Sequence, residues 1–195
     1  MGARALEIIR GEHRSLAAVL HALQFLARNI RDIGAVPDYA LLRLLVDYIE
    51  SFHQRFHHPK EDDYLFRAIR KRTRDADAML ADLEAQHAEG DGRLQELREA
   101  VNRLQASGGR ATGEFAQAVD TYADFHWRHM RQEEDSLMPL AERVLEPGDW
   151  QMIDAAFNDN DDPVFGAVPQ RKYAALLKLI LSQSPPPVGY GESRD

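Results

Sequence analysis

Apolar residues recur every three or four positions through most of this chain, and this spacing constrains its fold more than any other feature. Residues spaced in this way share one face of an α-helix, so each such segment predicts a helix that buries one side. The first segment shows the pattern at Leu6, Ile9, Leu16, Leu20, Leu23, Ala27 and Ile30. The sequence therefore predicts an all-α fold, an antiparallel up-down-up-down four-helix bundle with short C-terminal helices.

Turn and capping residues set the expected helix boundaries. The first helix should cover about residues 4–32, and the second should begin after Pro37. We expect Thr73 to cap the third helix, which should end at residues 107–109, and the fourth to begin near Gly113.

Two prolines should disturb the helices that contain them, because proline lacks an amide hydrogen and its ring clashes with the preceding turn. We expect a kink, or a break and restart, at Pro59, and a bend at Pro139.

The 195 residues divide into three predicted parts. Residues 1–148 should form the bundle, residues 149–182 a helical extension packed on it, and residues 183–195, which are low in apolar content, a disordered tail.

Charge and cysteine content exclude several classes of function. A net charge of -8 argues against non-specific binding of nucleic acid, and no apolar run is long enough to cross a membrane. Cysteine is absent, which excludes disulfides, thiolate catalysis and cysteine-ligated iron–sulfur clusters. Any metal must therefore be held by nitrogen and oxygen ligands. We expect a cytoplasmic protein without nucleic-acid or membrane partners; the sequence does not indicate its oligomeric state.

One motif occurs twice in the helical pattern. Residues 57–65 and 129–137 both read H-x-x-x-E-[DE]-D-x-L. Upstream of each motif a lone histidine, His13 or His87, occupies a position in an apolar stripe. Two helical hairpins would therefore each supply a lone histidine and an H-x-x-x-E pair, which indicates two similar stacked units.

Residues four apart on a helix share a face, about 6 Å from each other, so each motif histidine points to the same place as its glutamate. If the hairpins pack antiparallel, four imidazoles and two carboxylates converge in the core. Burying an ionised carboxylate without a partner costs several kcal/mol, and cations would remove that cost. The predicted metal ligands are His13, His57, Glu61, His87, His129 and Glu133.

The ligand types also restrict the metal. Mixed imidazole and carboxylate ligation suits iron, manganese or zinc and disfavours calcium and magnesium, which prefer oxygen ligands alone. Two ions with two carboxylate bridges and two imidazoles each would keep open positions. This arrangement favours iron and oxygen-type chemistry, with zinc or manganese as possible substitutes.

These motifs resemble the hemerythrin-like, or HHE cation-binding, domain, and the resemblance covers about residues 5–145. It is carried by Glu12 with His13, by residues 56–66, by His87 and by residues 129–145. The resemblance implies a pair of iron ions with an oxo or hydroxo bridge, held by the same six residues. It also implies a small ligand such as dioxygen, nitric oxide or peroxide.

The chain departs from the oxygen-carrying hemerythrins at two positions. Those proteins have a second histidine four residues after the one on the third helix, where this chain has Asp91. They also place the last carboxylate five residues after its histidine, which would be Glu134 rather than Glu133. The arrangement looks more like symmetric variants linked to iron handling, nitric oxide or iron–sulfur repair.

Two other classes of protein compete with this interpretation. A ferritin-like di-iron oxidase or peroxidase-type enzyme needs E-x-x-H on two helices, and residues 50–53 and 84–87 both match. That reading leaves His13, His57 and His129 unexplained. A structural zinc bundle is disfavoured because structural zinc sites are closed tetrahedra without bridging carboxylates.

Several residues near the motifs have open roles. His53 and His126 could be extra ligands, but we favour a role beside the ligands or a plain structural one. We expect His58 to be a surface or packing residue. Asp62, Asp91 and Glu134 should be solvated, and Glu134 is the first that could join the site.

Overall fold

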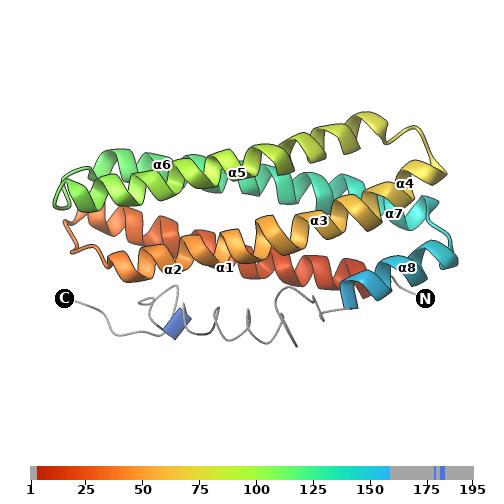
Figure 1. The fold of residues 1–195 in the computed structure, drawn as a ribbon, viewed down its shortest axis with the longest axis horizontal. Coiled ribbons are helices and arrows are strands. Elements are labelled where there is room, and N and C mark those ends of the chain that lie inside the picture. The colour runs from red at the N-terminus through yellow and green to blue at the C-terminus, as the bar shows by residue number, and fades with distance from the viewer. Residues whose placement is uncertain (1–3, 159–177, 179–180, 183–195) are drawn as a thin grey trace.

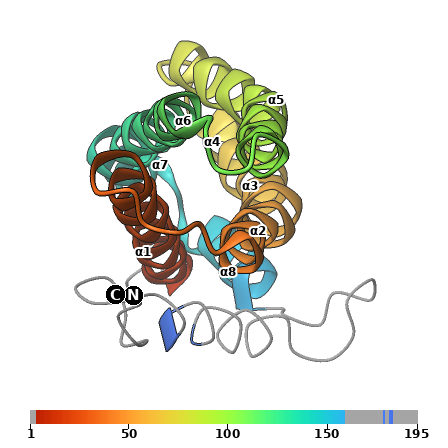
Figure 2. The ribbon, with the colours of Figure 1, turned by 90° about the vertical axis from the view of Figure 1, so that its left-hand side faces the viewer.

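The computed structural model describes residues 4–158, 178, 181 and 182, and this part of the chain contains helices and no strands (Figure 1). The all-α prediction is confirmed. Long helical stretches lie side by side around a common interior, as the end-on view shows (Figure 2). The two longest helices are α1 (Arg4–Asp32) and α5 (Asp77–Ala106).

The other two long stretches alternate between α-helix and π-helix, whose hydrogen bonds span five residues instead of four. The second stretch contains α2 (Tyr39–Ile49), η1 (Glu50–His57), α3 (His58–Lys60), η2 (Glu61–Phe66) and α4 (Arg67–Arg72). The other contains α6 (Thr112–Gln132), η3 (Glu133–Leu137) and α7 (Met138–Val144).

The chain stays helical through Pro59, so the expected break is not found. The His58 amide donates to the His53 carbonyl, five residues back, just before Pro59 enters α3. A π-turn here adds a residue to the helical turn, which accommodates the proline without ending the helix. Near Pro139, η3 directly precedes the α7 helix.

The predicted cap at Thr73 is wrong. The α5 helix begins at Asp77, and its N-cap residue, Ala76, makes no side-chain capping bond. The Thr73 hydroxyl instead accepts a hydrogen bond from the Asp75 amide at 3.1 Å. Thr73 therefore closes the turn after α4, because its side chain bonds the local backbone before the next helix has started.

A layer of polar residues divides the apolar core into two clusters. On α1, Ile9 belongs to one cluster and Leu16 to the other, with His13 between them. On α5, Leu83 and Leu94 are divided in the same way by His87. The polar layer is therefore enclosed by packed apolar side chains on both sides.

The α8 helix (Pro147–Asn158) packs on the end of the bundle that carries the chain's beginning. Ile153 and Phe157 are buried in one of the two core clusters. The Asp154 carboxylate accepts a hydrogen bond from the Ala5 amide at 2.8 Å, and Arg72 donates to Asp149 at 2.7 Å.

Beyond residue 158, the helical extension expected over residues 149–182 lies largely outside the described residues, and the tail expected at 183–195 lies entirely outside them. Within the described part of the chain, every helix is too short or too polar to cross a membrane.

Candidate metal centre

The six predicted ligands come together in the polar layer. His13 lies on α1, His87 on α5 and His129 on α6, while His57 ends η1. The two glutamates occupy equivalent places, because Glu61 is the first residue of η2 and Glu133 the first residue of η3. All six side chains are buried, and none is more than 7% exposed.

Their potential ligand atoms form two overlapping groups, in each of which the atoms lie within 4.8 Å of one another. One group contains His13, His57 and Glu61. The other contains Glu61, His87, His129 and Glu133. Two ions side by side could each be held by two imidazoles.

Each glutamate lies between histidines of both halves of the chain. Glu61 Oε2 is 3.3 Å from His57 Nε2 and 3.7 Å from His87 Nε2. Glu133 Oε2 is 3.2 Å from His13 Nε2, and its Oε1 is 3.4 Å from His129 Nε2. None of the four carboxylate oxygens of Glu61 and Glu133 has a hydrogen-bond partner among the described residues. Buried carboxylates placed in this way are suited to bridge two cations.

The outer nitrogen of each predicted ligand histidine is held by a residue from a neighbouring helical stretch. Nδ1 of His13 is 2.8 Å from Glu134, and Nδ1 of His87 is 2.9 Å from Asp62. Each partner atom is a carboxylate oxygen, which can only accept, so Nδ1 carries a hydrogen and Nε2 is the nitrogen that faces the interior.

The other two predicted ligand histidines are also held at Nδ1 by an oxygen that accepts a hydrogen bond. Nδ1 of His57 is 2.7 Å from the carboxylate of Glu12, and Nδ1 of His129 is 3.0 Å from the amide oxygen of Gln86. The Gln86 amide nitrogen donates to Asp82 and Gln132, which orients its oxygen toward His129.

These four bonds form a closed ring around the bundle. Glu12 of α1 holds His57 in the second helical stretch. Asp62 of that second stretch holds His87 of α5. The α5 helix holds His129 of α6, and Glu134 of η3 holds His13 of α1. The ring fixes every imidazole with its free nitrogen directed inward.

The pKa values of several ionisable groups in the polar layer are strongly shifted from their usual ranges. Burial raises the pKa of Glu61 well above its usual range, and the neighbouring Glu133 raises it further. For Glu133 the effect of burial is outweighed by His129, His13 and His87, which lower its pKa well below the usual range.

Two of the histidines favour the protonated form. Burial lowers the pKa of His13, but Glu133 and Glu134 outweigh it and raise the pKa to about 9. Burial also lowers the pKa of His87, and Asp62 and Glu133 together raise it to about 9. Burial lowers the pKa of His129 to about 4. The raised pKa values of His13 and His87 therefore favour binding of protons at a site whose geometry also suits metal cations.

The structure separates Glu133 from Glu134 as the phase of the helix predicts. Glu133 is fully buried and faces three histidines, whereas Glu134 is partly exposed and contacts His13 from outside. Glu134 and Asp62 were both expected to be solvated; both are partly exposed, but each also holds the Nδ1 of a histidine, which was not predicted.

Sequence reasoning also missed Glu12 and Gln86 as histidine partners. A usable signal exists in the repeat, because Glu12 and Gln86 directly precede the lone histidines. Asp62 and Glu134 likewise directly follow the two glutamates of the motif.

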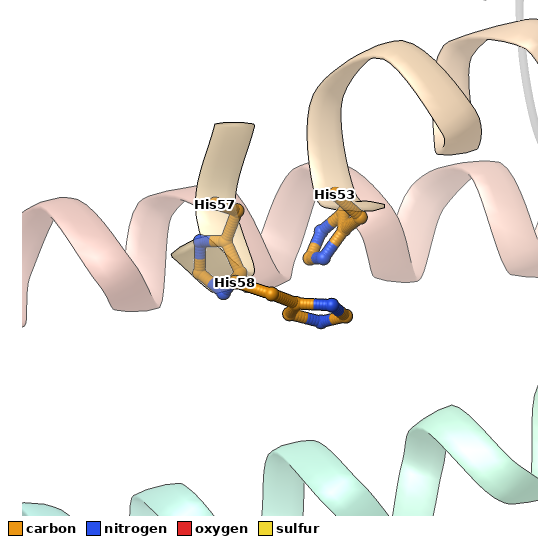
Figure 3. Close-up of side chains that lie close together, drawn as sticks. All are labelled: His53, His57 and His58. Carbon is orange, nitrogen blue, oxygen red and sulfur yellow. The ribbon is translucent and has the colours of Figure 1, made fainter. Parts of the chain in front are cut away.

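Three further histidines lie beside the six residues. His53, His58 and His126 are buried, so the expectation that His58 is a surface residue is wrong, although packing was the other role considered. Neither ring nitrogen of His53 or His126 has a hydrogen-bond partner within the described ranges, so neither holds a predicted ligand in place. Figure 3 shows His53 and His58 gathered beside His57.

The two glutamates of the E-x-x-H motifs do not enter the polar layer. Glu50 accepts hydrogen bonds from Arg55 and Arg98, and Glu84 accepts from Arg70. Asp91, which stands where oxygen carriers have a histidine, is exposed. The geometry therefore gives no support to a ferritin-like ligand set.

A comparison with protein families agrees with the geometry. The family model described as the hemerythrin HHE cation binding domain matches residues 4–141, well over half of the chain. No curated protein and no solved structure matches the chain.

Proposed function

The chain belongs to the hemerythrin HHE cation binding domain family, and we propose that it binds two iron ions and, through them, a small ligand. The ligand would be dioxygen, nitric oxide or peroxide, or the protein would sense iron itself. The proposed ligands are His13, His57, Glu61, His87, His129 and Glu133. Zinc or manganese could substitute for iron, because the same donor atoms suit them.

One observation carries this proposal: two buried carboxylates lie between four inward-facing imidazole nitrogens, and none of these atoms has a hydrogen-bond partner in the described chain. Such a group of unpartnered polar atoms would cost several kcal/mol in a core unless cations were bound there. The match to a cation-binding family supports the same conclusion.

The glutamates, the histidines and the apolar clusters would have different roles at the metal centre. The iron ions, when bound, supply the redox chemistry and the binding of the small ligand. Glu61 and Glu133 offset the repulsion between the two cations, and the four histidines neutralise no charge but hold the ions in place. The two apolar clusters exclude bulk water from both sides, which strengthens these electrostatic interactions.

The proposal includes an antiparallel up-down-up-down order of four helices within residues 1–148, a helical extension over 149–182 and a tail over 183–195. Short connections between successive stretches, such as residues 33–38 and 107–111, support this order. A cytoplasmic location is also part of the proposal. A ferritin-like enzyme is not proposed, because Glu50 and Glu84 pair with arginines outside the layer.

The test is to load the full chain with iron under anaerobic conditions and measure the metal content. We expect two ions per chain, and new charge-transfer absorption after exposure to oxygen, azide or nitric oxide. Glu61→Ala should weaken both ions, whereas His13→Ala should weaken mainly the ion shared with His57. A native protein that holds a single ion when fully loaded would contradict the proposal.

A further inference from the structure

The metal centre has four lateral faces through which a small ligand could enter. The two apolar clusters close the centre along the bundle axis, so entry must occur between neighbouring helical stretches (Figure 2). Each face is crossed by one Nδ1 hydrogen bond of the closed ring. These bonds join His57 to Glu12, His87 to Asp62, His129 to Gln86 and His13 to Glu134.

The face between α5 and α6 differs from the other three. Its bond, between His129 and Gln86, is the longest of the four at 3.0 Å and the only one of them with a neutral acceptor. Hydrogen bonds to a carboxylate are shorter and stronger than those to an amide. The α5–α6 face is therefore the least firmly held of the four.

A cleft of about 320 Å³ opens on this same face. Three residues of α5 and five of α6 line it, and Tyr122 is the only buried residue among them. Tyr122 therefore forms the inner wall of the cleft. A smaller cleft of about 90 Å³ lies between α2 and α5, but its lining includes Val46 and Val101, which belong to an apolar cluster.

Tyr122 connects the larger cleft to the metal centre. It precedes His126 by four residues on α6, and the centroids of the two rings are 4.6 Å apart. The ring centroid of His126 is in turn 6.2 Å from that of His129, a proposed ligand. All three residues are buried, so they form a row along the inner side of α6 from the cleft wall to the ions.

This row is polar although it is buried. The Tyr122 hydroxyl and both ring nitrogens of His126 have no hydrogen-bond partner among the described residues. Buried polar groups are normally paired with protein atoms or with ordered water. Water and small uncharged molecules can therefore pass along this row, whereas an ion would pay the full cost of desolvation at the wall.

We propose that the small ligand enters the metal centre through the α5–α6 face, and that Tyr122 controls its passage from the cleft. This inference rests on the proposed function. It assigns the entrance to one face of the bundle, and it restricts the ligand to a small molecule that is uncharged while it crosses the wall.

The first test needs no iron. NMR measures how fast the ring NH proton of His126 exchanges with solvent in the metal-free full chain. Tyr122→Leu, which opens the wall, should speed this exchange at least about tenfold, because exchange reports local access of water. Thr121→Trp, which fills the cleft from an exposed position, should slow it. The ring NH of His57, held by Glu12 on the opposite face, is the internal reference and should keep its native rate.

The second test uses the full chain loaded anaerobically with iron(II), and nitric oxide as the probe. Tyr122→Leu should raise the association and dissociation rate constants by the same factor, at least about tenfold, because the wall alters the barrier to entry and not the bound state. Thr121→Trp should lower both rate constants, and the equilibrium dissociation constant should stay native in both variants. The matched control is Asn102→Trp, which fills the smaller cleft from an equally exposed position and should keep the native rates.

Thr121→Trp keeps the test decisive even if Tyr122→Leu fails to fold, because Thr121 is exposed and outside the core. Native exchange at His126 and native rates for nitric oxide in Thr121→Trp would overturn this inference and leave the proposed function intact. Equal slowing by Asn102→Trp would also overturn it, since the α5–α6 face would then have no special role. Fewer than two irons in the native chain would instead overturn the proposed function itself.

Discussion

At the scale of single residues, the closed ring of Nδ1 bonds distinguishes residues that bind metal from residues that orient the ligands. Glu133 faces three histidine nitrogens, while Glu134 holds His13 from outside. Glu133→Ala should therefore lose both ions, because it removes one of the two anions proposed to bridge them. Glu134→Ala should keep two ions and weaken the one shared by His13 about 10–100-fold. Iron titration against a chelator measures both; loss of both ions in Glu134→Ala alone would reverse the assignment.

The same ring shows which parts of the site the sequence could predict. The proximity of His57 and Glu61 was predictable because residues four apart share a helix face. The partner of each Nδ1 lies on another helical stretch, and no spacing within one helix predicts it. The surface position that was one of the two roles expected for His58 would hold in an α-helix, which turns it about 100° away from His57. A π-turn rotates less per residue, so both side chains reach the core.

At the scale of elements, the alignment of the two halves extends beyond the ligands. A π-helix starts at Glu61 in one half and at Glu133 in the other. The apolar spacing predicted the long helices, since burial of one face produces that pattern. It could not predict the π-helices, because the same residues allow either hydrogen-bond register and only packing around the polar layer selects one.

The docking of α8 depends on Asp149, which ties the start of this helix to the bundle. Asp149 accepts hydrogen bonds from the Arg72 side chain and the Glu146 amide, the second of which caps α8. Asp149→Ala should lower the free energy of unfolding by about 1 kcal/mol and leave the iron content unchanged. Denaturant unfolding of the variant, with exposed Glu142→Ala as control, measures the difference. Loss of iron in Asp149→Ala would show that α8 supports the metal centre.

The pKa of Asp149 determines how its contribution to stability changes with pH. The Arg72 hydrogen bond holds the pKa of Asp149 below its usual value of 3.8. Its contribution to stability is therefore present above that value and is lost as the pH falls through the lowered pKa. The difference in the free energy of unfolding between the native protein and Asp149→Ala should therefore decrease as the pH falls.

At the scale of the whole molecule, metal binding and folding should be coupled. The polar layer lies between the two apolar clusters, so its unpartnered atoms weaken the middle of the core when no cation is bound. Iron at about 100 times its dissociation constant should add about 2.7 kcal/mol of stability per site. Chelation should therefore lower the thermal unfolding midpoint. An unchanged midpoint would mean that the layer is stable without cations.

This coupling should depend on pH in a direction set by His13 and His87, whose pKa values are raised from 6.5 to about 9 in the metal-free fold. Both bind protons more tightly folded than unfolded, so the stability they add is complete below pH 6.5 and lost as the pH rises through about 9. Iron must displace those protons, so its apparent affinity rises over the same range.

Both effects come from one proton release: from pH 6.5 to about 9 the metal-free protein loses stability, whereas the iron-loaded protein, whose His13 and His87 carry no such protons, does not. The gap between their thermal unfolding midpoints should therefore widen from pH 6.5 to about 9 and level off above it. Anaerobic unfolding of both forms at several pH values measures the gap. His129 contributes little to the change, because burial lowers its pKa to about 4 and it is already neutral in this range. A gap that stays constant with pH would mean that His13 and His87 release no protons when iron binds, and would contradict their assignment as ligands.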